Sequence, residues 1–338
     1  MLTSFPFVFA ACREGSEPSL KADVARRHGD LLTPAFMRPQ LITWKAKKPL
    51  PAGFELDSPF ARVSGFSLGP VKSAADIVSR LQEQNITRVT LNVSPRLVPE
   101  NGETDWKALD EAESALKRDL TAAGLQIADS AKDGEIVLEV ILEPEADKPL
   151  FAGVHEQRGG LCTRLPRVTL PTHAPSRAWL KAEQGLAWRG WAAEDLRGRV
   201  ALDLGCAPGG ASLALLDRGM RVTGVDTGDM DEAVLRHDSG GFRHLRVPLA
   251  HLDVTKLPAS VDLMLCDINL APPEVLPHLA RLQQTLNVPR MLLTLKMNTP
   301  VFEKRIDEFL TYIRGFAPAP VHVTQLPANR REVCIAAG

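Results

Sequence analysis

Four titratable residues stand where they could take part in acid–base chemistry. Asp267 and Lys296 each end an apolar, strand-like run, and Glu332 opens the last such run of the chain. Lys181 lies on a predicted helix. A lysine at the tip of an apolar strand is costly to bury unless it is paired. Taken singly, Lys181 fits a solvated helix and Glu332 fits an edge strand, so the hypothesis depends on the four side chains meeting.

A tight turn follows the apolar run that ends at Asp203, and a helix-compatible run begins after it. The turn contains Gly205, Ala207, Pro208, Gly209 and Gly210. Glycines here tolerate unusual backbone angles and let a ligand approach the end of the strand. Such a turn after a buried strand predicts a nucleotide-type ligand.

Two aspartates further along could contact the same ligand. Asp226 ends the next strand-like run, about twenty residues after the first glycine, where an acidic residue can accept hydrogen bonds from ribose hydroxyls. The pattern predicts a nucleoside-containing cofactor, although Asp226 could equally cap a helix. Asp253 fits either a ligand contact or an ordinary turn residue.

Strands and helices alternate from about residue 176 onward, which predicts a doubly wound α/β sheet. The expected strands are 199–203, 221–225, 243–247, 261–266, 290–295, 320–325 and 332–336. The expected helices are 177–189, 210–218, 230–237, 273–286 and 300–315. The link between the last two strands is too short for a parallel crossover, so one of them must be antiparallel. A seven-stranded, mostly parallel sheet with an antiparallel last strand is the methyltransferase variant of the Rossmann fold.

The first part of the chain, 1–150, reads as a mixed α+β region without a glycine-rich nucleotide loop, so we expect it to bind a partner. Its expected strands are 7–11, 41–44, 62–68, 87–93 and 135–142, and its expected helices are 74–82 and 106–123. The segment 151–175 is rich in proline, glycine and arginine and is predicted to be a connector. The third region, 176–338, is the predicted α/β domain.

Composition limits the class of protein. The 338 residues suit two domains, and a net charge of -1 confines any nucleic-acid surface to a local patch. The five cysteines include no pair with zinc-site spacing, so we expect reduced thiols, a cytoplasmic location and no metal. No apolar run approaches the roughly 18 residues of a membrane helix. The apolar segment 5–12 is expected to be a strand, with a short lipoprotein signal as the alternative.

The motifs together resemble the FtsJ-type RNA 2′-O-methyltransferases. The resemblance rests on Asp203–Gly210, Leu265–Asp267, Leu295–Lys296 and Arg331–Val333. In addition, Leu165–Val168 and Ala174–Lys181 resemble the RlmM enzymes. That resemblance implies S-adenosylmethionine as cofactor, a cytidine of 23S ribosomal RNA as substrate and a THUMP-like N-terminal domain that binds RNA. It makes Lys181, Asp267, Lys296 and Glu332 a catalytic tetrad in which Lys296 deprotonates the ribose 2′-hydroxyl.

The same resemblance implies roles for the cofactor-binding residues. Asp226 would hold the cofactor ribose and Asp253 the adenine amino group. Gly205 and the residues Ala207–Gly210 would hold the amino-acid end of the cofactor. Asp267 would approach the methionine amine, and the hydroxyl of Ser176 would supply a further hydrogen bond to the cofactor. The pKa of Lys296 is expected to be lowered by Lys181 and burial and raised by the two carboxylates, with the balance open.

Some features depart from this pattern or remain open. Ala178 replaces a usual hydroxyl residue and Ala211 a frequent aromatic one, which leaves the target nucleotide in doubt. Seven arginines are expected to contact RNA phosphates: Arg158, Arg164, Arg167, Arg177, Arg189, Arg330 and Arg331. The rival hypotheses are a non-catalytic RNA-binding protein with a decayed methyltransferase domain and an NAD-dependent dehydrogenase. The Gly-x-x-x-Gly-Gly spacing and the absence of a catalytic His or Tyr constellation disfavour the dehydrogenase. The oligomeric state has no signature in the sequence.

Overall fold

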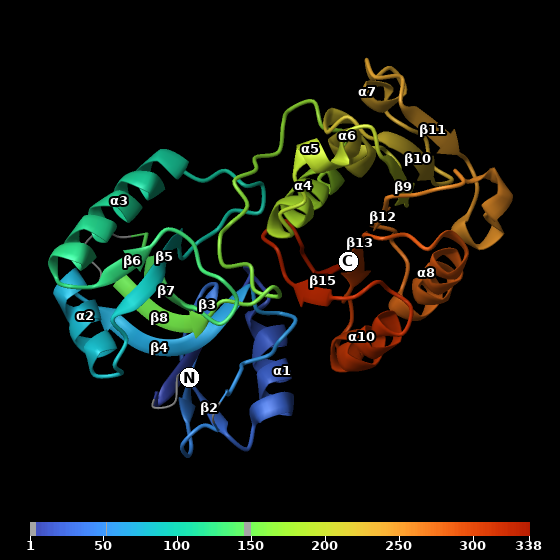
Figure 1. The fold of residues 1–338 in the computed structure, drawn as a ribbon. Helices are drawn as coiled ribbons and strands as arrows, with labels where there is room; N and C mark the ends of the chain where they lie inside the picture. The colour runs from blue at the N-terminus through green and yellow to red at the C-terminus, as the bar shows by residue number, and fades with distance from the viewer. Residues whose placement is uncertain (1–4, 52, 145–149) are drawn as a thin grey trace. The chain divides into compact units, whose positions relative to one another are not determined.

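The chain divides into two compact units, which are described separately. The computed structural model describes residues 1–338 except 1–4, 52 and 145–149. Unit 1 comprises Met1–Pro99 and Thr104–Leu165, and unit 2 comprises Glu100–Glu103 and Pro166–Gly338 (Figure 1). A short segment of four residues, 100–103, therefore groups with the second unit although its sequence neighbours belong to the first.

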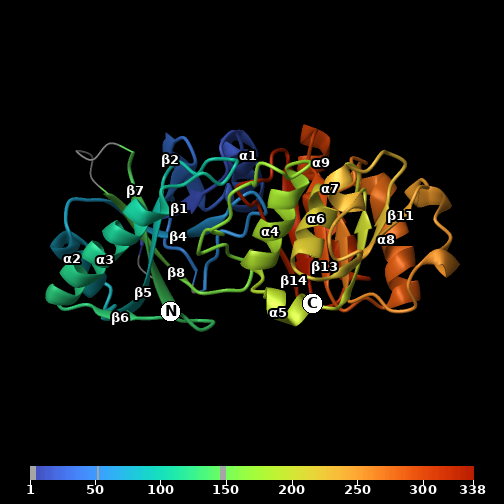
Figure 2. The same cartoon turned by 90° about the horizontal axis from the view of Figure 1, so that it is seen from above.

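Unit 1 is built on an eight-stranded sheet in the order β2-β3-β1-β4-β8-β7-β5-β6. Its strands are β1 Phe7–Ala11, β2 Leu32–Arg38, β3 Leu41–Ala46, β4 Val63–Val71, β5 Arg88–Pro95, β6 Gln126–Ala128, β7 Ile136–Leu142 and β8 Leu150–Glu156. Its helices are α1 Glu17–His28, α2 Ala74–Gln82 and α3 Trp106–Ala122. Helices α2 and α3 lie side by side against the sheet (Figure 2). Part of the core is an apolar cluster from β1, β3, β4, β7 and β8.

Four elements of unit 1, α1, β2, β6 and β8, are absent from the sequence prediction; β6 has only three residues, too few for a pattern. Helix α1 has a charged sequence with weak apolar periodicity, so no amphipathic pattern marked it. Strand β2 is an edge strand whose residues are mostly exposed, so it lacks the alternation of a half-buried strand. Strand β8 occupies the start of the segment predicted as a connector. Its Gly153 is a packing residue, since a Cβ there would lie 2.3 Å from the ring of Phe9.

Unit 2 contains a seven-stranded sheet in the order β11-β10-β9-β12-β13-β15-β14. The strands are β9 Val200–Leu204, β10 Arg221–Val225, β11 Phe242–Leu245, β12 Leu263–Cys266, β13 Met291–Lys296, β14 Val321–Thr324 and β15 Glu332–Ala337. Strand β15 is antiparallel to both neighbours, and the pairs on the other side of β13 are parallel. The predicted α/β methyltransferase sheet with an antiparallel last strand is therefore confirmed.

The helices of unit 2 lie on both faces of this sheet. They are α4 Ala178–Trp188, α5 Ala193–Leu196, α6 Gly210–Asp217, α7 Glu232–Leu235, α8 Pro272–Leu286, α9 Pro300–Lys304 and α10 Ile306–Arg314, with short 3-10 turns at Leu249–His251 and Val254–Lys256. Helices α4 and α6 pack together on one side, and α8 and α10 on the other (Figure 1). Across the described residues, every helix is too short or too polar to span a bilayer.

Candidate active site

The turn between β9 and α6 is held in shape by its own close packing. Gly205 and Gly209 have positive φ angles of 82° and 121°, which favour glycine. A Cβ on Gly209 would lie 2.4 Å from Val234, and one on Gly210 would lie 2.3 Å from the Ser176 hydroxyl. Protein atoms already occupy these positions, so the glycines are required by the fold of the turn itself, before any ligand is considered.

The side chain of Asp226 braces this turn from the end of β10. Its Oδ2 accepts a hydrogen bond from the Ala207 amide at 3.1 Å, and its Oδ1 accepts one from the Gly228 amide at 2.8 Å. Asp226 therefore lies beside the turn, and its contact with a cofactor ribose remains a prediction. Ser176 lies on the other side, where its hydroxyl accepts a bond from the Ala178 amide at 3.3 Å.

Asp253 is exposed and forms a local cap. Its Oδ1 accepts hydrogen bonds from the amide and the hydroxyl of Thr255, at 3.0 and 2.7 Å. These two bonds lower the pKa of Asp253. In the structure, Asp253 therefore stabilises a local turn, and its expected contact with adenine remains a prediction.

The four predicted acid–base residues come together at one edge of the sheet. Lys181 on α4 donates to Asp267 at 3.1 and 3.3 Å and to Glu332 Oε1 at 2.8 Å. Lys296 donates to Asp267 Oδ1 at 2.7 Å and to Glu332 Oε1 at 3.2 Å. All four side chains are 9–13% exposed. Each ammonium thus contacts both carboxylates, and the group is neutral as a whole.

Strand topology explains why residues so far apart in sequence meet. Asp267 directly follows β12 and Lys296 ends the parallel strand β13. Glu332 begins the antiparallel strand β15 and is paired in register with Lys296. The carboxyl ends of two parallel strands and the amino end of an antiparallel one therefore share an edge, where open α/β sheets bind ligands.

Comparison with known proteins assigns a family to this unit. Residues 174–307 match the model of the FtsJ-like methyltransferase family. The chain carries an FtsJ-like methyltransferase domain. The resemblance seen in the sequence is thereby confirmed, and the site just described lies on this domain or, for Glu332, on the strand that completes its sheet.

Curated relatives extend the comparison. The chain is 35% identical over 164 residues to the ribosomal RNA large subunit methyltransferase M of Pseudomonas fluorescens, covering 46% of this chain and 43% of the relative. It is 43% identical over 110 residues to the protein of that name from Azotobacter vinelandii. This match covers 31% of this chain and 29% of the relative. The matched region thus spans less than half of these relatives. Among solved structures, TrmN from Thermus thermophilus aligns over 98% of this chain and 99% of its own, with 16% identity and a TM-score of 0.38, too low to establish a shared fold.

Electrostatics of the FtsJ-like domain are set by the close carboxylates. Burial alone would lower the pKa of Lys296, but Asp267 and Glu332 outweigh it, and the pKa lies above the ordinary lysine value. The sequence left open whether burial or the two carboxylates dominate the pKa of Lys296. In the structure the carboxylates dominate, and the charged amine is favoured. In the ligand-free protein Lys296 is an ammonium at neutral pH.

Asp203, which the sequence analysis did not select, is a further unusual group of this domain. It is buried, its Oδ2 accepts a bond from Ser212 at 2.6 Å, and its Oδ1 has no partner among the described residues. Burial raises its pKa to about 7. The Ser212 hydrogen bond opposes this shift, while Asp267 and Asp226 add to it. The sequence does contain a signal for this residue, because Asp203 is an acidic residue at the end of an apolar run.

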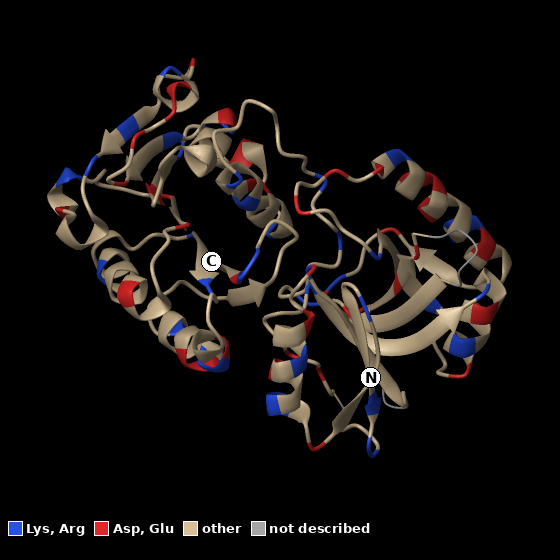
Figure 3. Cartoon of the chain, turned by 180° about the vertical axis from the view of Figure 1, so that it is seen from behind, with Lys and Arg blue, Asp and Glu red and all other residues tan. Residues whose placement is uncertain are grey.

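The arginines expected to contact RNA mostly have partners within the protein. Four of the seven form ion pairs: Arg158 with Glu55 and Glu156, Arg164 with Glu113, and Arg177 and Arg330 with Glu100. Positions with basic and acidic residues are interspersed along the backbone of each unit (Figure 3). Within the described ranges, no group of three or more His, Cys, Asp or Glu residues is arranged to hold a metal ion.

Proposed function

We propose that the protein is an S-adenosylmethionine-dependent methyltransferase that modifies a ribose 2′-hydroxyl of RNA, with a cytidine of 23S ribosomal RNA as the expected target. The observation that carries the proposal is the convergence of two ammonium groups and two carboxylates at the sheet edge of an FtsJ-like domain. The names of the curated relatives support ribosomal RNA of the large subunit as substrate. A cytoplasmic location follows from that substrate.

The charges around the turn fit a cationic cofactor. Burial raises the pKa of Asp203 to about 7, and the charges of Asp267 and Asp226 add to this shift, so the carboxylates of Asp226 and Asp267 both lie near Asp203 beside the turn. S-adenosylmethionine carries a sulfonium and an ammonium, which these carboxylates would attract. The diphosphate of NAD would instead meet like charge, which disfavours the dehydrogenase alternative.

Individual contacts follow from the positions of the residues around the turn. The chain segment Gly205–Gly210 and Ser176 would hold the amino-acid end of the cofactor, with Asp267 near its amine. Asp226 would accept bonds from its ribose, and Asp253 would contact adenine from its exposed turn. When bound, the cofactor supplies an activated methyl group on its sulfonium.

The tetrad would position and deprotonate the ribose. Lys296 Nζ takes the proton of the 2′-hydroxyl as the oxygen bonds to the methyl carbon and the bond from that carbon to sulfur breaks. Asp267 and Glu332 would hold the Lys296 amine in place, and Lys181 would fix these two carboxylates. Because the resting pKa of Lys296 is raised, only a small neutral fraction is competent at pH 7, and positive charge arriving beside Asp267 would enlarge it.

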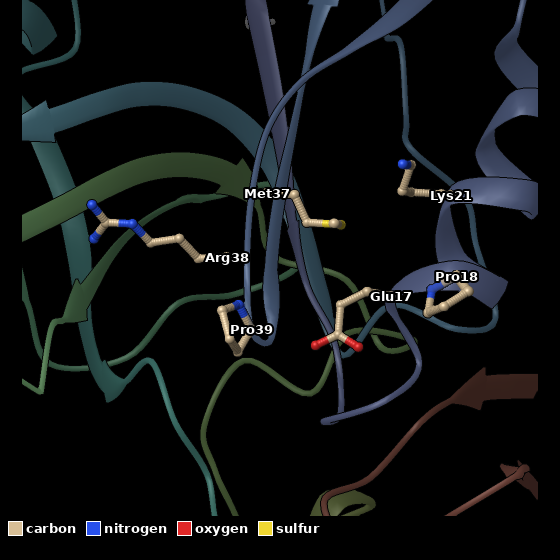
Figure 4. Close-up of a pocket in the computed structure, with 6 residues that line it drawn as sticks. All are labelled: Glu17, Pro18, Lys21, Met37, Arg38 and Pro39. Atoms are coloured by element: carbon tan, nitrogen blue, oxygen red, sulfur yellow. The ribbon is translucent and has the colours of Figure 1, made fainter.

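Unit 1 is proposed to present the RNA, as the THUMP-like domain implied by the family would. A cavity of about 560 Å³ lies between α1 and the end of β2, lined by Glu17, Pro18, Lys21, Met37, Arg38 and Pro39 (Figure 4). Phe36, also on β2, is 45% exposed, and the guanidinium of Arg38 lies 5.1 Å from the centre of its ring. An exposed aromatic ring with an arginine is a surface on which an unstacked base can stack.

The test is methyl transfer from labelled S-adenosylmethionine to ribosomal RNA isolated from cells that lack the gene. We expect transfer to RNA by the wild type and its loss in Lys296→Ala with RNA binding retained. Lys304→Ala, which removes an exposed lysine of the same unit, serves as the matched control. RNA binding without transfer by the wild type would favour the non-catalytic alternative, and binding of NAD would favour the dehydrogenase. A map of the missing ribose methylations identifies the nucleotide.

A further inference from the structure

The segment Glu100–Glu103 is attached to unit 2 by contacts with the chain that leads into α4. The Leu170 amide donates to the Asn101 carbonyl at 3.2 Å, and the Thr169 hydroxyl donates to the Gly102 carbonyl at 3.3 Å. Gly102 has a positive φ of 77°, and a Cβ there would lie 2.0 Å from the Val168 carbonyl oxygen. Only glycine allows this approach, so the segment is seated closely on unit 2.

This seating brings Glu100 between two arginines. Its Oε2 lies 3.1 Å from Arg177 Nη1 and 3.1 Å from Arg330 Nε. Arg177 is further fixed by a bond from Nη2 to the Ala328 carbonyl at 3.1 Å. One carboxylate oxygen thus contacts two guanidinium groups.

Both arginines are close to the proposed catalytic group. Arg177 precedes Lys181 by one helical turn, and Arg330 lies two residues before Glu332. Burial lowers the pKa of Arg177, Arg330 lowers it further, and Glu332 acts in the opposite direction, so these side chains lie within electrostatic reach of one another. A substrate whose ribose reaches the tetrad would bring its phosphate near this pair.

Two guanidinium groups around one oxygen anion form an arrangement suited to a phosphate. The carboxylate of Glu100 supplies that anion in the protein alone. The side chain of Glu100 is 30% exposed, that of Arg330 62% and that of Arg177 28%, so the pair with Arg330 is open to solvent while the pair with Arg177 is half-buried. The exposed pair with Arg330 is weak. A phosphodiester that replaces the carboxylate would again place an oxygen anion between the two guanidinium groups, so the half-buried Arg177 would keep an anionic partner.

We infer that Arg177 and Arg330 form a phosphodiester-binding site for the substrate RNA, and that Glu100 occupies this site until RNA displaces it. The inference rests on the proposed function, because it takes RNA as the substrate. It adds a site and an internal competitor that neither the family match nor the tetrad supplies. Glu100 then limits RNA affinity and favours RNA that can place a phosphate beside the target ribose.

The test is binding of a fluorescein-labelled oligoribonucleotide to the 338-residue chain, followed by fluorescence anisotropy at several salt concentrations. Glu100→Gln should tighten binding roughly three- to tenfold, because the carboxylate no longer competes. Glu103→Gln makes the same charge change in the same segment, where the side chain is exposed and no ion pair involves it among the described contacts, and should have a much smaller effect. Arg330→Ala and Arg177→Ala should weaken binding, and each should lower the salt slope by about 0.7.

Two outcomes would overturn the inference. Equal affinities of Glu100→Gln and Glu103→Gln would show that Glu100 does not compete with RNA. Weaker binding by Glu100→Gln, with an unchanged melting temperature, would show that it supports the site instead. Methyl transfer measured in parallel separates this result from the proposed function. Wild-type protein that binds RNA without transferring methyl refutes the function and leaves the competition measurable.

Discussion

The substitution Asp203→Asn tests how much charge the fold buries beside the glycine turn. Asp203 is fully enclosed, has one hydrogen bond from Ser212 and keeps its other oxygen without a partner among the described residues. Its pKa is raised from 3.8 to about 7, chiefly by burial. Asparagine has nearly the same shape and keeps an oxygen for Ser212, but it carries no charge at any pH.

The size of the effect follows from the shift in pKa. Between pH 4 and pH 7 the folded protein holds a proton that the unfolded chain has released, so stability falls as pH rises. At 1.36 kcal/mol for each pH unit, the difference between 3.8 and about 7 corresponds to about 4 kcal/mol of lost stability above pH 7. An amide group without a partner costs about 1–3 kcal/mol at every pH. Asp203→Asn should therefore destabilise the protein at pH 4 and stabilise it by about 1–3 kcal/mol at pH 8.

The assay is urea unfolding of wild type and variant at pH 4, 5, 6, 7 and 8. Only the difference between the two proteins is used, because titrating groups that do not interact with Asp203 cancel in it; Asp226 and Asp267 do interact with it. The exposed Asp238→Asn variant is the control and should give a difference that is small at every pH. A difference between wild type and Asp203→Asn that stays constant from pH 4 to pH 8 would refute the buried, proton-holding carboxyl.

Three other predictions concern the tetrad and the turn. Because the pKa of Lys296 is raised in the free protein, kcat/KM for S-adenosylmethionine, which reports groups of the free enzyme, should rise about tenfold per pH unit from pH 7 to 9. A plateau of this kcat/KM below pH 8 would exclude Lys296 as the base. In urea unfolding, Lys296→Met should lower the free energy of unfolding by about 3 kcal/mol, because it leaves buried carboxylates without this partner. The double variant Lys296→Met/Asp267→Asn should lose less free energy of unfolding than the sum of the two single variants. Additive losses would mean that the charges are not coupled. Gly210→Ala should cost about 1–3 kcal/mol in a thermal or urea unfolding experiment, since its Cβ would meet the Ser176 hydroxyl at 2.3 Å, and an unchanged stability would contradict this packing.

The sheet of unit 2 was predictable because its five inner strands, β9, β10, β12, β13 and β15, are largely buried and apolar. The run Met291–Lys296 is marked by its composition alone, and the short link before Glu332 requires an antiparallel partner. Once the strand order is known, the meeting of Asp267, Lys296 and Glu332 follows from the geometry of a parallel sheet. The edge strand β2 could not be predicted in this way, because exposed residues carry no alternating pattern.

The balance of forces at the site was not predictable, because it depends on distances of a few tenths of an ångström. The sequence indicates two amines that repel and two carboxylates that attract, but not which effect is larger. The structure places Asp267 Oδ1 2.7 Å from the Lys296 amine, and the pKa of this amine rises in consequence. Asp203 is a similar case, since its apolar run suggests burial but cannot show that one oxygen lacks a partner.

The arginines show why charge in a sequence does not by itself identify a nucleic-acid surface. Arg177 and Arg330 were expected to contact phosphates, and the structure pairs both with Glu100, a residue more than seventy positions away in the chain. An arginine that binds RNA and one that binds its own protein are both exposed and basic, so composition cannot separate them. An ion pair between an arginine and a carboxylate must break before RNA binds. The free energy of that ion pair is therefore subtracted from the free energy gained when the phosphate binds the arginine. The affinity of such a surface is then determined by its carboxylates as much as by its arginines.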